Sequence, residues 1–526
     1  MTPAPALLTD LRVRAAYSEG AGIYRIVPEG VAVPRSVEDV RRLAGWAADT
    51  RTSLVPRGAG SGIPGGNVGR GVIVDLSQGF HELSVDARRR VARAGASVTA
   101  AEIGAAALPY GLRLPPDPSS AAFATSGGLV ATNAAGPRSV RYGSVRRWVE
   151  AIEIVDASGE VRWVRRGGGR GERFALDDAE RRLVEARFPK TRKNSSGYAL
   201  DAFAASGDEL DLLIGSEGTL GMVTAVEWRL DPIPPDRAGV ALGFADLAAL
   251  DDALPFLLAL NPSALELLDH TLLSLVAAGS AEGMGAALPD LACLLLVEFE
   301  RETAAAARGV VGDAVRGLHH HTRHVETAVD RDGLAHLWAV RRLASPALAR
   351  LPETRRSLQV VEDGCVPLER TADYVAGLRE TSRGRGIELA MFGHAGDGHV
   401  HVNALPDTTR HGWREDLAAV LEDVTALLLQ LGGTPSGEHG DGRLRAGVLG
   451  RFVGAEVAAL FQDVKRAYDP RSVFNPGVII PAAAWAPLAD LKVGEAAAPI
   501  PDDIAARLRA VERTAEWAVP KTGLAD

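Results

Sequence analysis

Two glycine-rich segments hold the side chains best suited to chemistry. Residues 393–403 contain three histidines among glycines, and residues 436–442 contain the pair Glu438-His439. Glycine lets the backbone turn sharply, so these side chains can converge on one point. Two histidines and a glutamate are a common ligand set for a divalent metal ion with an open coordination position. A further histidine beside them can move a proton. The two segments therefore predict an active site.

The histidine spacing in the first segment fits a strand. Side chains alternate along a strand, so His399, His401 and Asn403 would share one face. A single histidine in a strand is usually a satisfied polar group. Three within eight residues, together with Glu438-His439 on another glycine-rich loop, favour a site instead.

Composition limits the classes of protein. The 526 residues are enough for two or three domains. The net charge of −9 argues against nucleic acid as the main partner. No apolar run approaches the roughly 20 residues of a membrane helix. The N-terminus lacks a signal-peptide pattern, so the cytoplasm is the expected compartment. Two cysteines exclude a disulfide scaffold and an iron–sulfur cluster held wholly by this chain.

The elements that must position the site alternate between strands and helices. The first residues predict a short helix and a strand, and residues 36–39 resemble a capping box before a helix. From 240 to 330, apolar strands alternate with Ala/Leu helices, which predicts an α+β layer. Heptad-like leucines and valines from 417 to 431 predict one helix ended by glycines. After residue 480 an Ala/Pro-rich tail carries one expected helix near 502–516.

Several features have plainer interpretations. His319, His320 and His321, with His324, lack glycines and a carboxylate in register, so we expect an exposed surface tract. The arginine-rich residues 162–193 are poorly periodic and are expected to be a solvated insertion, with partner docking as the alternative. Both cysteines are expected to be buried.

Glycine loops in the first half lie between strands. The loop 57–62 separates expected strands at 53–56 and 72–76, which differs from the strand–loop–helix order of a Rossmann unit. The prolines of 114–120 require extended backbone. Such loops, at 57–62, 115–120, 125–143 and 215–221, resemble in their order the FAD-binding domain of the vanillyl-alcohol-oxidase and p-cresol-methylhydroxylase (PCMH) type.

The resemblance implies FAD, and the residue chemistry agrees. A pyrophosphate needs several backbone N–H donors, which only glycine-rich turns bring close enough. Because no histidine lies in the loops 57–70 or 115–143, noncovalent FAD is expected. Leu129, Val130 and Val223 are expected to line an apolar flavin slot. The expected cofactor-binding residues are Arg57, Gly58, Ala59, Gly60, Ser61, Gly62, Pro116, Asp117, Ser119, Ser120, Thr125, Gly127, Gly128, Asn133, Gly136, Tyr142, Gly143, Glu217, Gly218, Gly221, Val223 and Asn475.

The second half resembles the branch with D-lactate dehydrogenase, the flavin subunit of glycolate oxidase and D-2-hydroxyglutarate dehydrogenase. Its marks are Trp338-x-x-Arg341, Glu362-Asp363-x-x-Val366-Pro367, the two histidine segments and Asn475-Pro476-Gly477. The resemblance, which covers roughly residues 20–480, implies metal ligands, a base and a substrate arginine. These are His394, His401 and Glu438 for the metal, His439 as general base, and Arg341 on the substrate carboxylate.

Three choices stay open within this resemblance. Position 399 is commonly Asn in relatives but is His here, so His399 is an additional or substitute ligand, or a substrate contact. The Trp-x-x-Arg spacing favours Arg341 over its neighbour Arg342. The ligand set favours Zn²⁺, with Mn²⁺ or Fe²⁺ as alternatives.

We therefore expect an α+β protein with a PCMH-type, two-subdomain FAD-binding domain. An α+β substrate (cap) domain with an antiparallel sheet and a C-terminal helical segment would follow it. The expected divisions are an N-terminal helical segment (1–27), the FAD-binding domain (28–235), the substrate and metal domain (236–480) and the tail (481–526). The proline-rich residues 231–235 mark the main boundary.

The function that the resemblance implies is FAD-dependent oxidation of a D-2-hydroxy acid (D-lactate, glycolate or D-2-hydroxyglutarate class) to the 2-oxo acid. A hydride would pass to flavin N5 with help from the metal. Electrons would leave to a separate iron–sulfur protein, cytochrome or quinone-linked acceptor, which would place the protein in the cytoplasm or peripherally at the inner membrane. The alternatives are a flavin electron-relay subunit without catalysis and a metal-dependent hydrolase.

Overall fold

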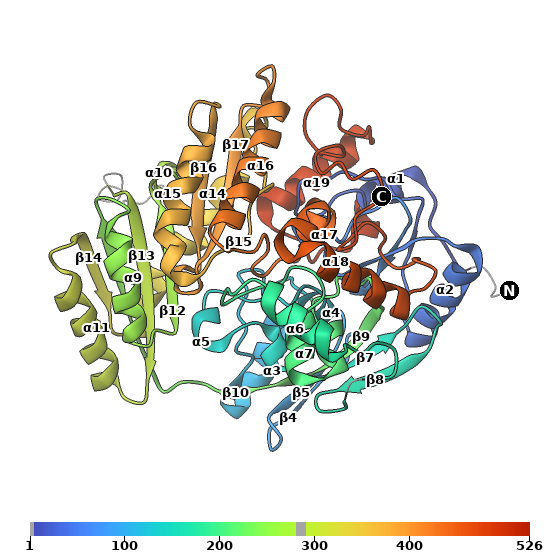
Figure 1. Cartoon of the computed structure of the whole chain (residues 1–526), viewed down its shortest axis with the longest axis horizontal. Helices are drawn as coiled ribbons and strands as arrows, with labels where there is room; N and C mark the ends of the chain where they lie inside the picture. Colours follow the sequence, from blue (N-terminus) through green and yellow to red (C-terminus); the bar gives the residue numbers. More distant parts are fainter. Residues whose placement is uncertain (1–4, 170, 280–290) are drawn as a thin grey trace.

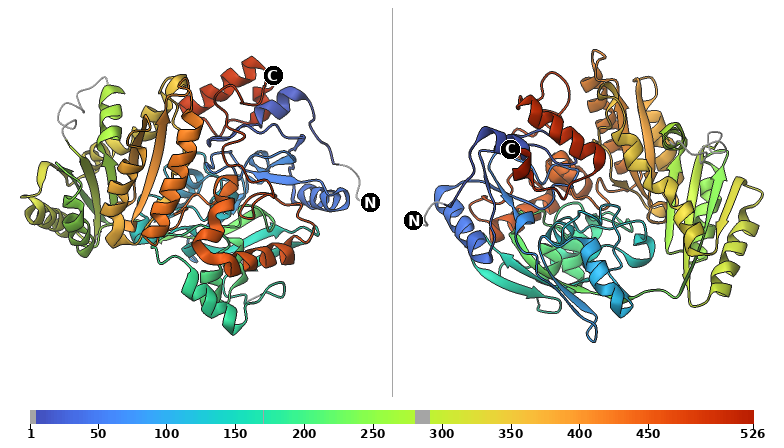
Figure 2. Two further views of the ribbon diagram at one scale, coloured as in Figure 1. Left: turned by 45° about the horizontal axis from the view of Figure 1, so that its top comes forward. Right: turned by 180° about the vertical axis from the view of Figure 1, so that it is seen from behind.

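The computed structural model describes residues 5–169, 171–279 and 291–526 of the chain. Residues 1–4, 170 and 280–290 lie outside this description; they fall within the expected N-terminal segment, the arginine-rich stretch and the expected α+β layer. Figure 1 shows a large sheet built by the middle of the chain beside a body built by the first half. The C-terminal segments lie between and over these two parts (Figure 2).

The first half contains two separate sheets, as expected for a two-subdomain FAD-binding domain. A parallel three-stranded sheet has the order β1-β3-β2, and an antiparallel five-stranded sheet has the order β4-β5-β9-β7-β8. The short strands β6 and β10 pair with each other. The strands are β1 (Gly30–Ala32), β2 (Leu54–Arg57), β3 (Val72–Asp75), β4 (Leu83–Asp86), β5 (Val91–Gly95), β6 (Leu112–Arg113), β7 (Val149–Val155), β8 (Val161–Arg165), β9 (Met222–Arg229) and β10 (Asp231–Pro232).

Short helices connect these strands. They are α1 (Leu11–Ala16), α2 (Val37–Thr50), α3 (Ala100–Ala107), α4 (Ser126–Thr132), α5 (Ser139–Tyr142), α6 (Asp178–Arg187), α7 (Leu200–Ser206) and α8 (Glu209–Leu213). The predicted start of α2 is confirmed, because the Ser36 hydroxyl accepts a hydrogen bond from the Asp39 N–H at 3.2 Å. The reciprocal half of the capping box is shifted by one residue, since Asp39 accepts from the Arg35 N–H at 3.1 Å.

The second half is built on one seven-stranded sheet of order β14-β11-β13-β12-β16-β17-β15. Its neighbouring strands are antiparallel throughout. The strands are β11 (Asp236–Phe244), β12 (Ala264–Asp269), β13 (Cys293–Arg301), β14 (Thr322–Ala328), β15 (Gly364–Cys365), β16 (Ile387–Gly393) and β17 (His399–Pro406). The predicted α+β layer with an antiparallel sheet is therefore confirmed.

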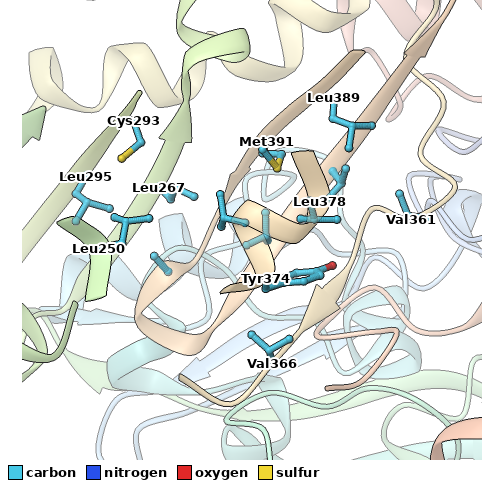
Figure 3. Packing of buried hydrophobic residues seen from close by; sticks show 14 of the residues in the cluster. Leu250, Leu267, Cys293, Leu295, Val361, Val366, Tyr374, Leu378, Leu389 and Met391 are labelled. Atoms are coloured by element: carbon cyan, nitrogen blue, oxygen red, sulfur yellow. The ribbon is translucent and has the colours of Figure 1, made fainter. Parts of the chain in front are cut away.

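Helices cover both faces of this sheet because both faces carry apolar side chains. One face packs its core under α9 (Ala249–Ala259), α11 (Ala304–Leu318), α15 (Thr371–Ser382) and α16 (Trp413–Gln430), as Figure 3 shows for Leu267, Leu295 and Met391. The other face packs under α10 (His270–Gly279), α12 (Arg331–Leu337), α13 (Ala339–Arg342) and α14 (Ala344–Ala349). Burial on both faces explains the nearly continuous apolar run of the central strand β13.

The chain returns to the first half after the second sheet. Helix α17 (Gly442–Arg445) precedes α18 (Leu449–Tyr468), whose apolar side joins the core of the FAD-binding half. There Phe461 meets Phe188 and Tyr198 edge-on, with ring centroids 6.2 and 5.9 Å apart. The predicted tail helix is confirmed as α19 (Asp502–Thr514), which contacts both α1 and α14. The proposed domain boundaries stay predictions.

The arginine-rich residues 162–193 are exposed over much of their length, as expected of a solvated segment, but they form regular structure. They contain β8 and α6, and several arginines of this stretch form ion pairs with buried carboxylates of the same half. Arg162 pairs with Glu209 at 2.6 Å and Arg165 with Glu227 at 2.7 Å. The sequence pattern hid this because the partners lie about 50 residues further along the chain.

Two plainer expectations are confirmed. His319, His320 and His321 are exposed at the end of α11, whereas His324 lies half-buried in β14. Both cysteines are buried. Within the described residues, no helix is both long enough and apolar enough to cross a membrane.

Ion pairs join the two halves. The Arg138 guanidinium donates two hydrogen bonds of 2.8 Å to Glu298, whose side chain is 1% exposed. Arg113 donates to Glu300 at 2.9 Å, and the Ser139 hydroxyl donates to Asp397 at 2.6 Å. These contacts fix the position of the large sheet relative to the glycine loops of the first half.

The substitution Arg138→Met tests this connection. Removing the guanidinium leaves Glu298 buried without its bidentate partner, so the free energy of unfolding should fall by about 3 kcal/mol. Urea titration measures the loss. Arg316→Met is the matched control, because Arg316 and Asp313 form an exposed pair whose removal should change stability by less than about 1 kcal/mol. Equal effects of the two substitutions would contradict the role given to Arg138.

Candidate active site

A tight turn between β16 and β17 brings three imidazoles together. His394 follows the last residue of β16, and His399 begins β17. Gly398 allows the turn, since its φ of 72° is a left-handed conformation in which a Cβ would lie 2.2 Å from a backbone oxygen. The rings of His399 and His401 are 4.6 Å apart between centroids, and those of His394 and His401 are 5.2 Å apart.

Asp363 organises the second glycine-rich loop. Its Oδ2 accepts hydrogen bonds from the Ser436 hydroxyl at 2.5 Å, from the Glu438 N–H at 3.2 Å and from the His439 N–H at 2.8 Å. Its backbone carbonyl accepts from the Gly437 N–H at 2.8 Å. One buried carboxylate thus sets the backbone that presents Glu438 and His439.

The three expected metal ligands meet at one point. His394 Nε2 lies 3.1 Å and His401 Nε2 lies 3.2 Å from the same oxygen, Oε1 of Glu438. All three side chains are buried. Burial opposes ionisation of Glu438, but Lys193 and His394 outweigh it and hold its pKa well below the usual range.

This donor set fits a divalent cation. Two imidazole nitrogens and one carboxylate oxygen are ligands suited to Zn²⁺, Mn²⁺ or Fe²⁺. His394 also has the outer support typical of a metal-bound histidine, because its Nδ1 lies 2.5 Å from Glu266 Oε1. The ligand roles themselves stay predictions.

His399 lies beside this cluster, and both of its nitrogens have protein partners. Its Nε2 is 2.8 Å from Asp363 Oδ1, and its Nδ1 is 3.3 Å from the Lys193 ammonium nitrogen. It offers a nitrogen close enough to the other donors to join the cluster. Burial, with Lys193 and His401, lowers the pKa of His399 to about 3, so its ring is neutral.

His439 stacks on His401 at the edge of the cavity. Their ring centroids are 5.0 Å apart with an interplanar angle of 19°. His439 Nδ1 lies 2.7 Å from Glu362 Oε2, and Arg445 pairs with the other oxygen of Glu362. Burial disfavours a charged ring, but Glu362 and Asp363 outweigh it and raise the pKa of His439 to about 10.

Arg341 connects to the same cluster through Glu266. Its Nε donates to Glu266 Oε2 at 2.9 Å, and its guanidinium lies over the Phe392 ring at 4.4 Å. Arg341 is buried, whereas the neighbouring Arg342 is exposed and donates to a backbone carbonyl. Both arginines line the cavity described below, so the preference for Arg341 over Arg342 stays a prediction.

One cavity of about 1550 Å³ connects this cluster with the glycine loops of the first half. Arg341, His394, His401, Glu438 and His439 line one part of it. The other part is lined by most of the expected cofactor-binding residues, namely Arg57, Gly58, Ala59, Gly60, Ser61, Gly62, Asp117, Ser119, Ser120, Thr125, Gly127, Gly128, Gly136, Glu217, Gly218, Gly221 and Val223.

The loop residues have groups ready for an anionic, polar cofactor. In the described part of the chain, the backbone N–H groups of residues 58–62 donate to no protein acceptor. Asp117 Oδ1 is also buried without a partner at the cavity wall. Free N–H groups on a glycine-rich turn suit a pyrophosphate, and a free carboxylate oxygen suits a ribose hydroxyl. The cavity therefore fits FAD.

Five of the expected cofactor residues are absent from the cavity lining. Asn133 accepts from the Arg146 N–H, and Asn475 donates to the carbonyls of Gly66 and Glu217, so these two side chains hold loops in place. The Tyr142 hydroxyl donates to Glu300, Pro116 precedes the lining residue Asp117, and Gly143 ends helix α5 with a φ of 68°. Of the three residues expected in the flavin slot, Leu129 and Val223 line the cavity, whereas Val130 packs in the core.

Sequence reasoning gave no role to several residues that build the site. Glu266, Lys193 and Arg445 are buried and contact His394, Glu438 and Glu362 respectively. A carboxylate in the apolar strand β12 was the one visible signal for Glu266, since an ionised group is buried only with partners. Asp363 belongs to a motif that was recognised without a role.

Comparisons with known proteins agree with this geometry. Residues 28–165 match the family described as an FAD binding domain, and residues 233–479 match the C-terminal domain of FAD linked oxidases. The chain is 31% identical to a D-lactate dehydrogenase of Archaeoglobus fulgidus over 453 residues, which cover 86% of this chain and 91% of that protein. It is 29% identical to glycolate oxidase subunit GlcD of Bacillus subtilis, over 86% of this chain and 89% of that protein.

Two more distant comparisons extend the picture. A D-2-hydroxyglutarate dehydrogenase of Pantoea ananatis is 28% identical over 90% of this chain, and the chain spans half of that longer protein. The solved structure of p-cresol methylhydroxylase with substrate bound superposes with a TM-score of 0.66 at 15% identity, covering 90% of this chain and 94% of that one. This last likeness concerns the fold alone.

Gly60→Ala tests whether the loop 58–62 receives the FAD phosphates. Gly60 has φ +82°, and a Cβ there would lie 2.3 Å from the buried Arg57 guanidinium. The strain of about 1–3 kcal/mol should raise the dissociation constant of FAD about tenfold or more, as measured by flavin fluorescence. Gly104→Ala in α3 is the control, because nothing lies within 4 Å of its added Cβ. Unchanged FAD affinity in both variants would remove the loop from the cofactor site.

Proposed function

The chain belongs to the FAD-linked oxidases, and from this premise we propose that it oxidises a D-2-hydroxy acid to the 2-oxo acid. It is an FAD-dependent oxidoreductase, so the open questions are its substrate and the roles of its residues. The observation that carries the proposal is that one cavity joins the FAD loops to a cluster of two histidines, Glu438 and a buried arginine. The relatives named for D-lactate, glycolate and D-2-hydroxyglutarate support the substrate class.

Arg341 would bind the carboxylate of the acid. Within the described chain only its Nε has a hydrogen-bond partner, so both terminal nitrogens remain for a bidentate contact. Glu266 holds the guanidinium and His394 at once. This shared partner fixes the distance between the carboxylate site and the cluster that would receive the α-hydroxyl.

His394, His401 and Glu438 would hold a divalent cation, with Zn²⁺ preferred. Such a cation lowers the pKa of a bound hydroxyl group, which makes the α-hydroxyl easier to deprotonate. Bound FAD supplies the hydride acceptor at N5. The residues that would hold the cation and those that would hold FAD line the same cavity, as an alcohol oxidation would require.

His439 would accept the hydroxyl proton. It lines the cavity, stacks on His401, and is oriented by Glu362 through Nδ1, so Nε2 remains for the substrate. Glu362 and Asp363 hold the pKa of this histidine near 10 in the protein alone. A divalent cation held by the adjacent Glu438 would oppose that effect, so the His439 ring would act as a base at lower pH once the proposed ligand set is filled.

Electrons would leave to a separate acceptor. Both cysteines of the chain are buried, and no cluster can be built from them. The acceptor would be an iron–sulfur protein, a cytochrome or a quinone-linked protein. The protein would associate with a membrane only if this acceptor is a membrane protein. The arginines of residues 162–193 offer less free charge for docking than the sequence suggests, since many are paired.

The direct test is an anaerobic titration of the FAD-loaded protein. D-lactate, glycolate, D-2-hydroxyglutarate and the available L-enantiomers are added separately while the visible absorption band of oxidised flavin is followed. Bleaching by one D-acid identifies the substrate. A flavin band that no hydroxy acid bleaches would favour the electron-relay alternative, and a protein that binds no FAD would favour the hydrolase.

His439→Asn tests the base. The variant should bind FAD normally, and flavin reduction by the acid should slow by about 10²–10⁴-fold, the range for loss of a general base. Stopped-flow absorbance measures the rate. His411→Asn, on a loop away from the cavity lining, is the control and should reduce at the wild-type rate. Wild-type reduction by the His439 variant would exclude it as the base.

Metal removal and pH should act together on flavin reduction. Because a base works only when unprotonated, the rate should rise with pH and level off above the pKa of His439. With the cation bound, that midpoint should lie below the value of about 10 expected for the protein alone. A chelator should abolish reduction at pH 8, and Zn²⁺ should restore it. Full activity in protein verified to be metal-free would contradict the metal assignment.

A further inference from the structure

Lys193 is the buried cation closest to the proposed metal ligands, and no step of the proposed reaction uses it. Its ammonium nitrogen lies 2.5 Å from Oε2 of Glu438, while Oε1 of the same carboxylate faces His394 and His401. Its side chain is 4% exposed and is absent from the cavity lining. Lys193 therefore contacts the Glu438 oxygen that faces away from the two histidines, and it does not line the cavity that would hold a substrate.

The segment that carries Lys193 is fastened to the Glu438 loop. The Ser195 N–H donates to the Ser436 carbonyl at 2.9 Å, and the Ser195 hydroxyl donates to the Gly437 carbonyl at 3.2 Å. The Gly197 N–H donates to Asp441 at 2.6 Å. These bonds bracket Glu438 on both sides, so the ammonium position follows from backbone contacts as well as from charge attraction.

His399 completes a chain of donors and acceptors. Its Nε2–H donates to Asp363 Oδ1 at 2.8 Å, which leaves Nδ1 to accept from the Lys193 ammonium at 3.3 Å. The ammonium donates in turn to Glu438 Oε2. Asp363 also accepts hydrogen bonds from the backbone N–H groups of Glu438 and His439. This series of hydrogen bonds therefore begins and ends on the loop that carries Glu438.

We propose that Lys193 is a positioning residue that keeps Glu438 a one-oxygen ligand, and that His399 supports Lys193 instead of binding the metal. With Oε2 occupied by the ammonium, only Oε1 is free to join the two imidazoles. The cation then has three protein ligands and an open position for the substrate hydroxyl. This inference rests on the proposed metal site and goes beyond it by assigning the outer residues of this chain. Residue 193 lies outside both matched family regions, 28–165 and 233–479.

Lys193→Met, made in the full-length, FAD-loaded protein, removes the ammonium while keeping an unbranched, buried side chain. Glu438 is then free to use both oxygens, so the visible absorption of bound Co²⁺ should weaken as the coordination number rises. Metal affinity, measured by competition with a chelating dye, should fall about 10–100-fold, the range for loss of an outer-shell partner. Lys193→Arg should recover most of the cobalt absorption, because it restores a cation that donates to Oε2.

Three control variants distinguish the effect of Lys193 from general effects of removing a buried charge or a metal ligand. Lys492→Met removes another buried, ion-paired lysine, whose partner is Glu512, and should leave the cobalt spectrum unchanged. His399→Asn should keep one metal ion per chain with a smaller loss of affinity than Lys193→Met. His394→Asn removes a proposed ligand and should abolish metal binding. Flavin content and melting temperature confirm that each variant is folded.

The outcomes separate this inference from the proposed function. A Lys193→Met protein with the wild-type cobalt spectrum and metal affinity overturns the positioning role. A gain in metal affinity also overturns it, because Lys193 would then weaken cation binding. Loss of metal from His399→Asn equal to that from His394→Asn would make His399 a ligand. All of these readouts are taken without substrate, so they stand even when no D-acid reduces the flavin.

Discussion

The burial of four carboxylates at one place is the constraint on which the rest of the site depends. Glu266, Glu362, Asp363 and Glu438 are each nearly inaccessible to solvent. A buried charge without partners costs several kcal/mol, so every oxygen must be matched by a cation or a donor. Arg341, Arg445 and Lys193 supply three positive charges. Asp363 is matched by the His399 ring, by the His439 ring and by backbone N–H groups of the Glu438 loop.

These pairs would link proton binding to metal binding in the proposed site. Glu362 and Asp363 raise the pKa of His439 to about 10 in the protein alone. A cation held by His394, His401 and Glu438 would oppose that effect, so His439 would become a base once the proposed metal site is filled. One electrostatic requirement would then serve both proposed roles.

Sequence reasoning located the proposed reacting groups but not the groups that hold them. His394, His401, Glu438, His439 and Arg341 stand out because glycine-rich turns or motif spacing mark them, and the structure brings them to one cavity. Lys193 lies in a stretch whose arginines looked solvated, and its partner is 245 residues away. Periodicity shows which face of an element is buried, but it carries no information about which distant segment covers that face.

The same limit explains the cofactor residues that miss the cavity. Asn133 and Asn475 belong to motifs that the family resemblance marks, yet their amides bind backbone groups of neighbouring loops. Both have positive φ, at 53° and 45°, a conformation that asparagine tolerates better than most residues. Their motif positions therefore reflect loop geometry, which a sequence pattern cannot distinguish from ligand contact.

The cavity wall is built by more than the predicted substrate domain. A cavity of about 1550 Å³ exceeds the usual size for one small ligand, so it has room for a cofactor and a substrate together. Side chains from 240–380 line part of it, but Arg509 and Trp517 of the C-terminal tail line another part. Helix α19 is held there by pairs between Arg356 and Glu512 and between Glu353 and Arg513. Arg509 and Trp517 follow the matched family region, which ends at residue 479. The family match therefore covers the proposed catalytic residues but not this part of the cavity wall.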